Sequence, residues 1–575
     1  METLPVTHAE PALQLVPGSA QGRVLACSDG ISFWGGVDPE SGRIIDVHHP
    51  NHGATVTGRV LAMPTSRGSC SGSGVLLELA LTGRAPAALV FCEGEETLTL
   101  GALVAQLVFG KTVPVLRLPA SLYAALTEAE TAQIDEGRSL RFDGTHHPVT
   151  PLQADALSLS PADRHRLDGG EGPVVQRAMQ VLCQMAAAQG AVQLMDVTRG
   201  HIDGCILAHD ANLIFAEKMA ELGAQVAIPT TINAISVDRE NWQTQGLPAD
   251  FGARASRLAD AYVRMGAQPT FTCAPYLLDD RPAQGEAIGW SESNAVIYAN
   301  TVLGARTVKH PDYLDLFIAM TGRAPLAGVY TDQGRRPRRR LRMSLPPARQ
   351  RDEAVWALVG WLAGRASPDR VPLILGLENE RLSADDLKSI CAAFGTTSGA
   401  PLLHVAGHTP EADLAPVPEA DEIALDTQAF AEGWVALNQA TEPVDLVAIG
   451  SPHASLSECQ RLAELLAGRS CEAAPMIVTV GRHVLAQASA DGTLATLQAA
   501  GAQVIPDLCW CSITEPIFPP AARSILTNSG KYAHYADGLS GRPVRLAGLA
   551  ACVEASVTGR APERPDWARV MLAQP

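Results

Sequence analysis

The feature that most constrains this chain is a regular alternation of helix-length and strand-length segments from Pro173 onward. Helical runs such as Ala354–Ala366 and Ala384–Phe394 alternate with short apolar runs such as Pro372–Leu377 and Met476–Val480. Continuous apolar strands are typical of parallel sheets that are covered on both faces. The pattern therefore predicts an α/β fold with a large, doubly wound parallel-sheet region.

Local signals place several ends of these segments. Ser383 with Asp386 and Ser455 with Glu458 have the spacing of capping boxes, which predicts that helices begin at both serines. Further helices are predicted at Pro173–Gly190 and Ala211–Gly223, and further strands at Val192–Val197, Gln225–Ile228, Pro401–Val405 and Val444–Ile449. In folds of this type ligands bind at the carboxyl ends of the strands, so polar loops after strands are the candidate sites.

The first 150 residues have a different character. Strands are predicted at Arg59–Met63, Ala88–Phe91 and Val113–Leu118, with a helix at Leu98–Gly110, a helix-like segment at Val75–Leu81 and many glycine turns. A chain of 575 residues exceeds what one core usually serves. We expect a small β-rich domain at 1–150 and a large region at 151–575 with room for two subdomains, joined by a polar linker at Thr150–Asp168.

Charge and cysteine usage limit the function classes. The net charge of −17 disfavours a nucleic-acid or anionic-membrane partner, since both would repel the chain. One basic run, Arg335–Arg342, breaks this balance; a solvated loop is the expected reading and a local anion site the alternative. No signal peptide or membrane-spanning stretch is recognisable, so a cytoplasmic location is expected. The twelve cysteines are then expected to be reduced and mostly buried, with a few available as metal ligands.

Seven polar loops carry residues suited to chemistry. The glycine- and serine-rich loop Met63–Gly74 contains Arg67, Ser69 and Ser71, and its backbone N–H groups could bind an anion and lower the pKa of a serine. Each loop could also be an ordinary turn, in which a cysteine is buried filler or a lysine is solvated. Cys509 and Cys511 are too close in sequence for a structural zinc. The other candidate loops are Thr198–Cys205, Pro229–Ala234, Thr270–Tyr276 with Gly289–Ala295, Gly450–His453, Asp507–Cys511 and Thr527–His534.

Taken together, these segments resemble the aconitase X family. The matching segments of its small swivelling domain are Gly35–Pro39, Gly42–Asp46, His49-Pro50 and Arg67–Ser73; those of its catalytic domain are His201–Gly204, Pro229–Asn233, Thr272–Tyr276, Trp290–Ala295, Asn300–Arg306, Pro452-His453 and Thr527–Lys531. One polypeptide with the small domain first is similar to the bacterial fused form, which needs no separate small subunit. The resemblance implies a hydro-lyase that dehydrates a small hydroxy acid, cis-3-hydroxy-L-proline in the first instance, to Δ1-pyrroline-2-carboxylate.

The resemblance also implies roles for individual residues. Ser69 is the implied base, with Ser71 in reserve and Arg67 helping to stabilise the alkoxide. Cys273 and Cys509 match cluster ligands of the family, and Cys205, Cys511 and Ser451 are the remaining candidates. Ser451 stands where archaeal relatives have a cysteine, which favours a [2Fe–2S] over a [4Fe–4S] cluster, with iron acting as Lewis acid. Substrate contacts match Gly204, Cys205, Ile206, Asn233, Glu292, Ser293 and Lys531.

Three other readings stay open at this point. The substrate could be another hydroxy acid, such as phosphomevalonate, the substrate of the two-subunit archaeal relatives. The chain could be a metal-free, non-catalytic binding protein of the same fold. A serine hydrolase is disfavoured, because the Gly68–Gly72 segment lacks the strand-to-helix elbow of a large α/β sheet.

Overall fold

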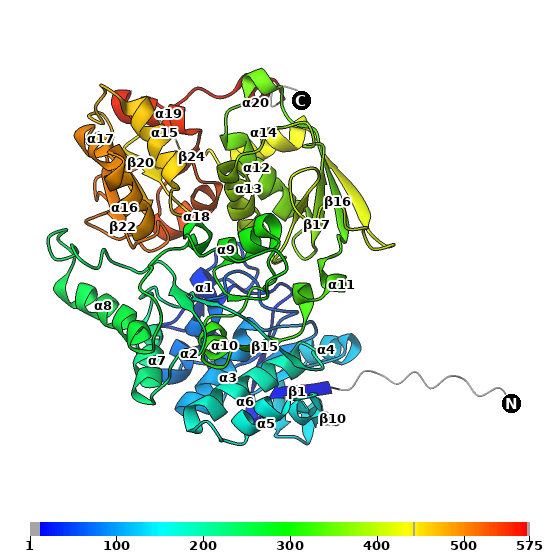
Figure 1. Ribbon diagram of the computed structural model, residues 1–575. Helices are drawn as coiled ribbons and strands as arrows, with labels where there is room; N and C mark the ends of the chain where they lie inside the picture. Colours follow the sequence, from blue (N-terminus) through cyan, green and yellow to red (C-terminus); the bar gives the residue numbers. More distant parts are fainter. Residues whose placement is uncertain (1–11, 441–442, 572–575) are drawn as a thin grey trace. The chain divides into compact units, whose positions relative to one another are not determined.

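The computed structural model describes residues 12–440 and 443–571, which form two compact units (Figure 1). Unit 1 comprises the described residues up to Asp196 together with His209–Ala227 and His310–Ala327. Unit 2 comprises Val197–Ala208, Ile228–Lys309 and the described residues from Gly328 onward. The chain thus crosses between the units several times, and the boundary expected at residue 150 stays a prediction. No helix in the described ranges is long and apolar enough to cross a membrane.

Unit 1 is built around a closed barrel of eight strands in the order β1-β10-β9-β8-β2-β5-β6-β7. The strands are β1 Ala12–Val16, β2 Ala20–Ala26, β5 Val60–Ala62, β6 Ala88–Phe91, β7 Val115–Arg117, β8 Thr131–Asp135, β9 Ser139–Phe142 and β10 Thr145–Pro151. Strands β2, β5, β6 and β7 pair in parallel, while β8 and β9 pair antiparallel with their neighbours. Closure removes the exposed edges that an open sheet of this kind would present.

Helices of unit 1 fix the loops that leave the barrel. They include α2 Gly72–Leu81, α3 Thr97–Phe109, α4 Ala120–Thr127, α5 Pro161–Leu167, α6 Pro173–Ala188, α7 Asp210–Glu221 and α10 Leu314–Thr321. Helices α2 and α3 pack closely because Gly101 has no side chain. A Cβ at this position would lie 2.7 Å from the carbonyl oxygen of Ser73. The helix expected at Leu98–Gly110 and the helix-like segment expected at Val75–Leu81 correspond to α3 and α2, whereas α4 was not expected. The prediction of a linker at Thr150–Asp168 was also wrong in part, because this segment contains α5. This helix begins with a capping box between Ser160 and Asp163.

Unit 2 contains two larger parallel sheets, as the alternation predicted. The four-stranded sheet has the order β18-β17-β16-β19, and the five-stranded sheet the order β22-β21-β20-β23-β24. The strands are β16 Arg339–Met343, β17 Pro372–Leu375, β18 His404–Val405, β19 Asp421–Leu425, β20 Leu446–Ile449, β21 Met476–Val480, β22 Gln503–Pro506, β23 Ile525–Thr527 and β24 Val544–Leu546. All their pairings are parallel. The predicted α/β class is confirmed.

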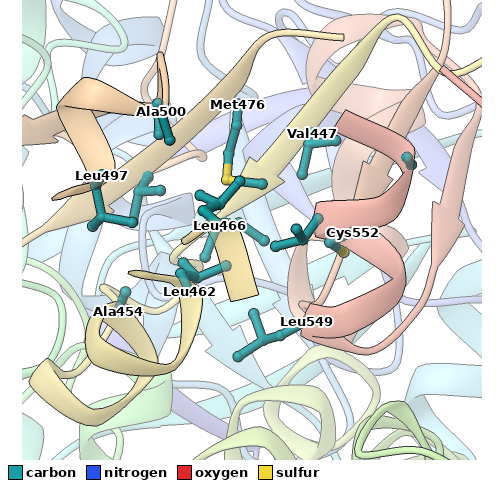
Figure 2. Packing of buried hydrophobic residues seen from close by; sticks show 14 of the residues in the cluster. Val447, Ala454, Leu462, Leu466, Met476, Leu497, Ala500, Leu549 and Cys552 are labelled. Atoms are coloured by element: carbon teal, nitrogen blue, oxygen red, sulfur yellow. The ribbon is translucent and has the colours of Figure 1, made fainter. Parts of the chain in front are cut away.

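Many helices of unit 2 pack against these sheets or against one another (Figure 1). The helices are α8 Ala249–Arg264, α9 Ser293–Tyr298, α11 Asp332–Arg335, α12 Ala354–Ala366, α13 Ala384–Thr397, α14 Thr427–Ala436, α15 Leu456–Leu466, α16 Arg482–Ala490, α17 Thr493–Ala499, α18 Gly530–Ser540, α19 Leu549–Thr558 and α20 Asp566–Met571. Figure 2 shows Val447 and Met476 of β20 and β21 packed with Leu462 and Leu466 of α15 and with Leu549 of α19. Both predicted capping boxes, at Ser383 and Ser455, are present.

A third, small parallel sheet in unit 2 corrects two expectations. Its order is β13-β12-β14, formed by Thr230–Ile232, Gly200–Ile202 and Gly289–Trp290. The strand expected at Gln225–Ile228 was wrong, since pairing begins only at Thr230, and the loops expected at 198–205 and 229–234 each contain a strand. Strands of two or three residues are too short to show a hydrophobic period, so sequence patterning could not reveal them.

The basic run Arg335–Arg342 is neither a solvated loop nor an unneutralised anion site. It ends α11 and forms most of β16, which pairs with the acid-containing strand β19. Arg339 pairs with Asp421 and Arg342 with Glu422. The side chain of Arg335 is fully buried; its guanidinium lies 2.5 Å from Glu411 and donates to the backbone carbonyls of Val329 and Asn300. The run is therefore a structural element with carboxylate partners on an adjacent strand and loop.

Replacing Arg335 by alanine should lower the free energy of unfolding by about 3–5 kcal/mol, because it leaves the Glu411 carboxylate without its buried partner. The matched control is Arg342→Ala, whose side chain is 56% exposed and whose loss should cost less than about 1 kcal/mol. Urea unfolding of the two variants beside the native chain measures both changes. Equal stabilities of the two variants would contradict the role given to Arg335.

Candidate active site

Three thiols from two loops of unit 2 come together, and we call them the thiol cluster. Cys273 lies in the loop after α8, and Cys509 and Cys511 lie in the loop after β22. The Sγ atoms of Cys273 and Cys509 are 3.8 Å apart, and Cys511 packs beside them. Cys273 and Cys509 are buried, while Cys511 is half-buried. The structure thus unites Cys273, Cys509 and Cys511, which the sequence had only suggested as separate candidates.

The loop that carries Cys509 is anchored by buried polar contacts. Asp507 has a left-handed backbone (φ 72°), and its carboxylate accepts hydrogen bonds from Arg482 at 2.5 Å and from the Arg239 backbone at 3.0 Å. Its carbonyl accepts from the backbone N–H of Ile235 at 2.8 Å. Ile235 is next to Ala234, which packs on the thiols. The Pro229–Ala234 segment and the Cys509 loop therefore hold each other in place.

A buried ion pair lies in the same unit. Glu292 immediately precedes α9, and Lys531 lies in the first turn of α18. Lys531 Nζ donates to Glu292 Oε1 at 2.7 Å, and both side chains are about nine-tenths buried. Asn294 also donates to this carboxylate. The pair brings together two residues that the sequence proposed independently as substrate contacts.

The pair stays charged because each partner outweighs the cost of burial. Burial alone would raise the pKa of Glu292, but the charge of Lys531 and the hydrogen bonds from Lys531 and Asn294 hold it below its usual range. Burial opposes charge on Lys531, but Glu292 and the three thiols together raise its pKa well above the ordinary value. A fixed positive charge is therefore present beside the thiol cluster.

The thiols differ in acidity. Hydrogen bonds from Cys273 and Cys511 lower the pKa of the Cys509 thiol well below its usual range, and the Lys531 charge acts in the same direction. Burial raises the pKa of Cys273, and the hydrogen bond to Cys509 together with burial raises that of Cys511. Cys509 is thus the most acidic thiol of the group and the one that most readily forms the thiolate, which is the form that binds metal and acts as a nucleophile.

Ser451 follows β20 and is 3% exposed. Its carbonyl oxygen accepts a hydrogen bond from Ser529, the N-cap of α18. Among the described residues, none donates to or accepts from the Ser451 hydroxyl. A cavity of about 30 Å³, room for about one water molecule, is lined by Ser451, Asn528 and Lys388 among others. The serine oxygen is therefore available to a ligand.

The remaining predicted contacts of unit 2 lie on the small sheet and on α9. Asn233, after β13, donates to the carboxylate of Asp203, after β12. In the Gly204–Ile206 turn, the thiol of Cys205 donates to the carbonyl of Ile202 at 3.4 Å. The thiol of Cys205 is not part of the buried group formed by Cys273 and Cys509. Ser293 is the first residue of α9.

His201, which the sequence raised as a candidate, lies on β12 and is fully buried. Its Nδ1 is 2.8 Å from the Thr231 hydroxyl, and its ring centroid is 5.8 Å from that of Trp290. Burial lowers the pKa of His201 to about 3, so the imidazole is neutral at physiological pH.

Unit 1 carries the serine loop, Arg67–Ser73. The backbone N–H of Ser71 donates to Ser69 Oγ at 3.3 Å, and the two hydroxyl oxygens are also 3.3 Å apart. Helix α2 begins directly afterwards, so its partial positive N-terminus lies next to these hydroxyls. Arg67 lies 3.6 Å from Asp29, and both side chains are half-exposed. The loop can stabilise negative charge on Ser69 through an N–H group and a helix end.

Two contributors escaped the sequence reasoning. Asn294 links the ion pair to the thiol cluster, because it donates to Glu292 and, at 3.0 Å, to the Cys273 carbonyl. His453 contacts both thiol-bearing loops. Each residue stands in a segment that the sequence singled out, Trp290–Ala295 and Gly450–His453. Their segments were the available signal, but the contacts with Cys273, Thr272 and Leu508 join segments that are separated in sequence and could not be deduced.

Comparisons with known proteins cover nearly the whole chain. Four family models match in order: the aconitase X swivel domain at residues 11–141, the first domain at 156–333, the second at 337–435 and the third at 444–558. The cis-3-hydroxy-L-proline dehydratase of Pseudomonas aeruginosa is 47% identical over 567 residues, covering 96% of this chain and 97% of the relative. That of Hypocrea jecorina is 42% identical, covering 95% and 94%.

Archaeal proteins are more distant. The phosphomevalonate dehydratase large subunit of Methanothermobacter thermautotrophicus is 30% identical and covers 67% of this chain and 94% of the relative. The crystal structure of Thermococcus kodakaraensis aconitase X in its holo-form aligns with a TM-score of 0.63 at 28% identity, covering 71% of this chain and all of that chain.

The buried ion pair yields a prediction for stability. Lys531→Met should lower the free energy of unfolding by about 3–5 kcal/mol, because the Glu292 carboxyl group is left buried without its charged partner. Adding Glu292→Gln should then cost less than it does in the native background, with a coupling of about 1–3 kcal/mol. Urea unfolding of the two single variants and the double variant measures this coupling. Additive effects would mean that the two side chains do not act as a pair.

Proposed function

The chain belongs to the aconitase X family, and from that premise we propose that it is a hydro-lyase converting cis-3-hydroxy-L-proline to Δ1-pyrroline-2-carboxylate. The observation that supports this proposal is the 47% identity to a cis-3-hydroxy-L-proline dehydratase over 96% of the chain. The phosphomevalonate dehydratase large subunit matches only two thirds of the chain, at 30% identity. The substrate assignment therefore favours the hydroxyproline, and the fused swivel domain removes the need for a separate small subunit.

The proposal includes an iron–sulfur cluster, for which the donor set in unit 2 is suitable. Iron–sulfur clusters are held by cysteine thiolates, and this site offers three thiols, of which Cys509 is already acidic. We assign Cys273, Cys509 and Cys511 as ligands, with Ser451 as the oxygen candidate because its hydroxyl is available. Among the described residues, no three His, Cys, Asp or Glu side chains are arranged as a metal-ion site. Ser451, which stands where archaeal relatives have a cysteine, is the reason for proposing the [2Fe–2S] form, whose iron would supply Lewis acidity toward the substrate hydroxyl.

The residues of unit 2 are assigned to substrate binding. Lys531 keeps two N–H groups beyond the one given to Glu292, and a substrate carboxylate is a suitable acceptor for them. Glu292 can accept a hydrogen bond from the ring ammonium of the hydroxyproline. Asn233 and the Gly204–Ile206 turn, with Ser293, complete the proposed contacts. Holding the carboxylate and ring nitrogen together would orient the hydroxyl-bearing carbon.

Ser69 of unit 1 is assigned as the base. It would take the proton from the α-carbon as the hydroxyl leaves with the C–O bonding electrons, so that the elements of water are lost. The Ser71 N–H and the N-terminus of α2 would stabilise the Ser69 alkoxide that accepts this proton, and the serine leaves the step as a neutral hydroxyl. The enamine product then tautomerises to the cyclic imine. Arg67 stays a candidate for further stabilisation, although it lies close to Asp29.

The test of this function is an anaerobic purification with iron and sulfide analysis, followed by assays on cis-3-hydroxy-L-proline and phosphomevalonate. We expect turnover of the hydroxyproline only, with the imine identified by mass spectrometry, and equal amounts of iron and sulfide. A cluster with turnover of phosphomevalonate alone would overturn the substrate. A metal-free protein without turnover would favour the non-catalytic binding protein. A cytoplasmic location stays a prediction.

Variants of the two assigned groups should separate chemistry from cluster binding. Ser69→Ala should lower kcat by about 1000-fold, the scale of a lost general base, while iron content stays unchanged. Cys273→Ser should instead lower both the iron content and the visible absorbance. Cys391→Ser, which alters a buried cysteine on α13, is the matched control and should keep both properties. Retention of most activity by Ser69→Ala would remove it from the mechanism and leave Ser71 as the candidate.

A further inference from the structure

His453 follows β20 in the Gly450–His453 loop and is fully buried. Its ring contacts two loops that approach from distant parts of the sequence. Nε2 is 2.7 Å from the carbonyl oxygen of Leu508, next to Cys509, and Nδ1 is 3.1 Å from the hydroxyl of Thr272, next to Cys273. Each nitrogen therefore touches the neighbour of a different thiol.

The backbone of His453 adds a direct contact to the thiol cluster. Its N–H donates to Cys273 Sγ at 3.3 Å. Its carbonyl oxygen accepts from Lys388 at 3.4 Å, and Lys388 is held by Glu458 on α15 and by Asp385 at 3.4 Å. The backbone of His453 is thus held by a buried ion cluster formed by residues of α13 and α15.

These contacts require one form of the ring. A carbonyl oxygen can only accept, so Nε2 carries the proton and Nδ1 accepts from the Thr272 hydroxyl. The Thr272 oxygen in turn accepts from the backbone N–H of Ala274 at 3.1 Å. The chain of donors and acceptors is complete on both sides of the ring, so the imidazole is neutral and fixed in orientation.

We propose that His453 is a positioning residue that clamps the Cys273 and Cys509 loops together and thereby sets the spacing of the two thiols. The thiols belong to segments 236 residues apart, and the ring bridges those segments beside the 3.8 Å contact between the sulfur atoms. Its value for the enzyme rests on the proposed function, because a cluster needs its ligands at a fixed spacing. The clamp itself is a property of the protein loops.

An ordinary core histidine provides the comparison. His404 on β18 is also buried, and its Nε2 lies 2.8 Å from the carbonyl of Arg335. It contacts neither thiol-bearing loop in any hydrogen bond among the described residues. His404→Ala is therefore the matched control, removing a buried imidazole of unit 2 without releasing these loops.

The test measures alkylation of individual cysteines by iodoacetamide in the purified full chain, using peptide mass spectrometry, beside iron and sulfide content. Buried thiols react when their loop opens. In His453→Ala, alkylation of Cys273 and Cys509 should be at least tenfold faster and the iron content should fall. Remote buried thiols such as Cys552 should keep the native rate, which separates local opening from global destabilisation. His404→Ala should leave Cys273 and Cys509 at the native rate.

Two conservative variants sharpen the test and keep it decisive if His453→Ala does not fold. Gln can keep the donor to Leu508, whereas Asn can keep the acceptor for Thr272. His453→Gln should therefore speed alkylation mainly at Cys273, and His453→Asn mainly at Cys509. Native alkylation rates with native iron content, or equal acceleration at Cys552, would overturn the clamp. If the native protein holds no iron, the proposed cluster fails, while the alkylation rates still decide on the clamp.

Discussion

The ion pair between Lys531 and Glu292 sets the electrostatics on which the candidate site depends. Both groups are about nine-tenths buried, where a lone charge would be too costly to keep. Their 2.7 Å contact joins the start of α18 to the start of α9 and keeps both groups charged. The positive charge then favours the Cys509 thiolate, so one contact supports both the substrate contacts and the thiol chemistry.

The same constraint operates elsewhere in unit 2. Arg335 is fully buried against Glu411, and Lys388 is buried against Glu458 and Asp385. Each of these cations joins segments that are distant in sequence, and each also donates to backbone carbonyls. Each of these buried cations is therefore paired with a carboxylate, which orders the loops between them.

Unit 1 positions the serine loop through its barrel and through backbone hydrogen bonds, not through a buried ion pair. The closed barrel supplies a rigid support for the serine loop, and helix α2 starts immediately after that loop. Ser73 donates to the carbonyls of Cys70 and Asp312, which ties the loop to the segment before α10. The hydroxyl of Ser69 is thus held by short-range geometry near a helix N-terminus, without a buried cation.

The sequence by itself determined the α/β class, the family, the capping boxes at Ser383 and Ser455, and the residue types offered for chemistry. These features are encoded locally, in hydrophobic periods, cap spacings and short motifs. Only the tertiary structure decided that Cys273 meets Cys509 and that Glu292 meets Lys531, 239 residues away. It also decided that Arg335 is buried and that the three-residue strands of the small sheet pair. Such contacts arise because packing of the helices and strands brings loops together that are remote in the sequence. Local hydrophobic periods and cap spacings carry no information about which remote loops will meet.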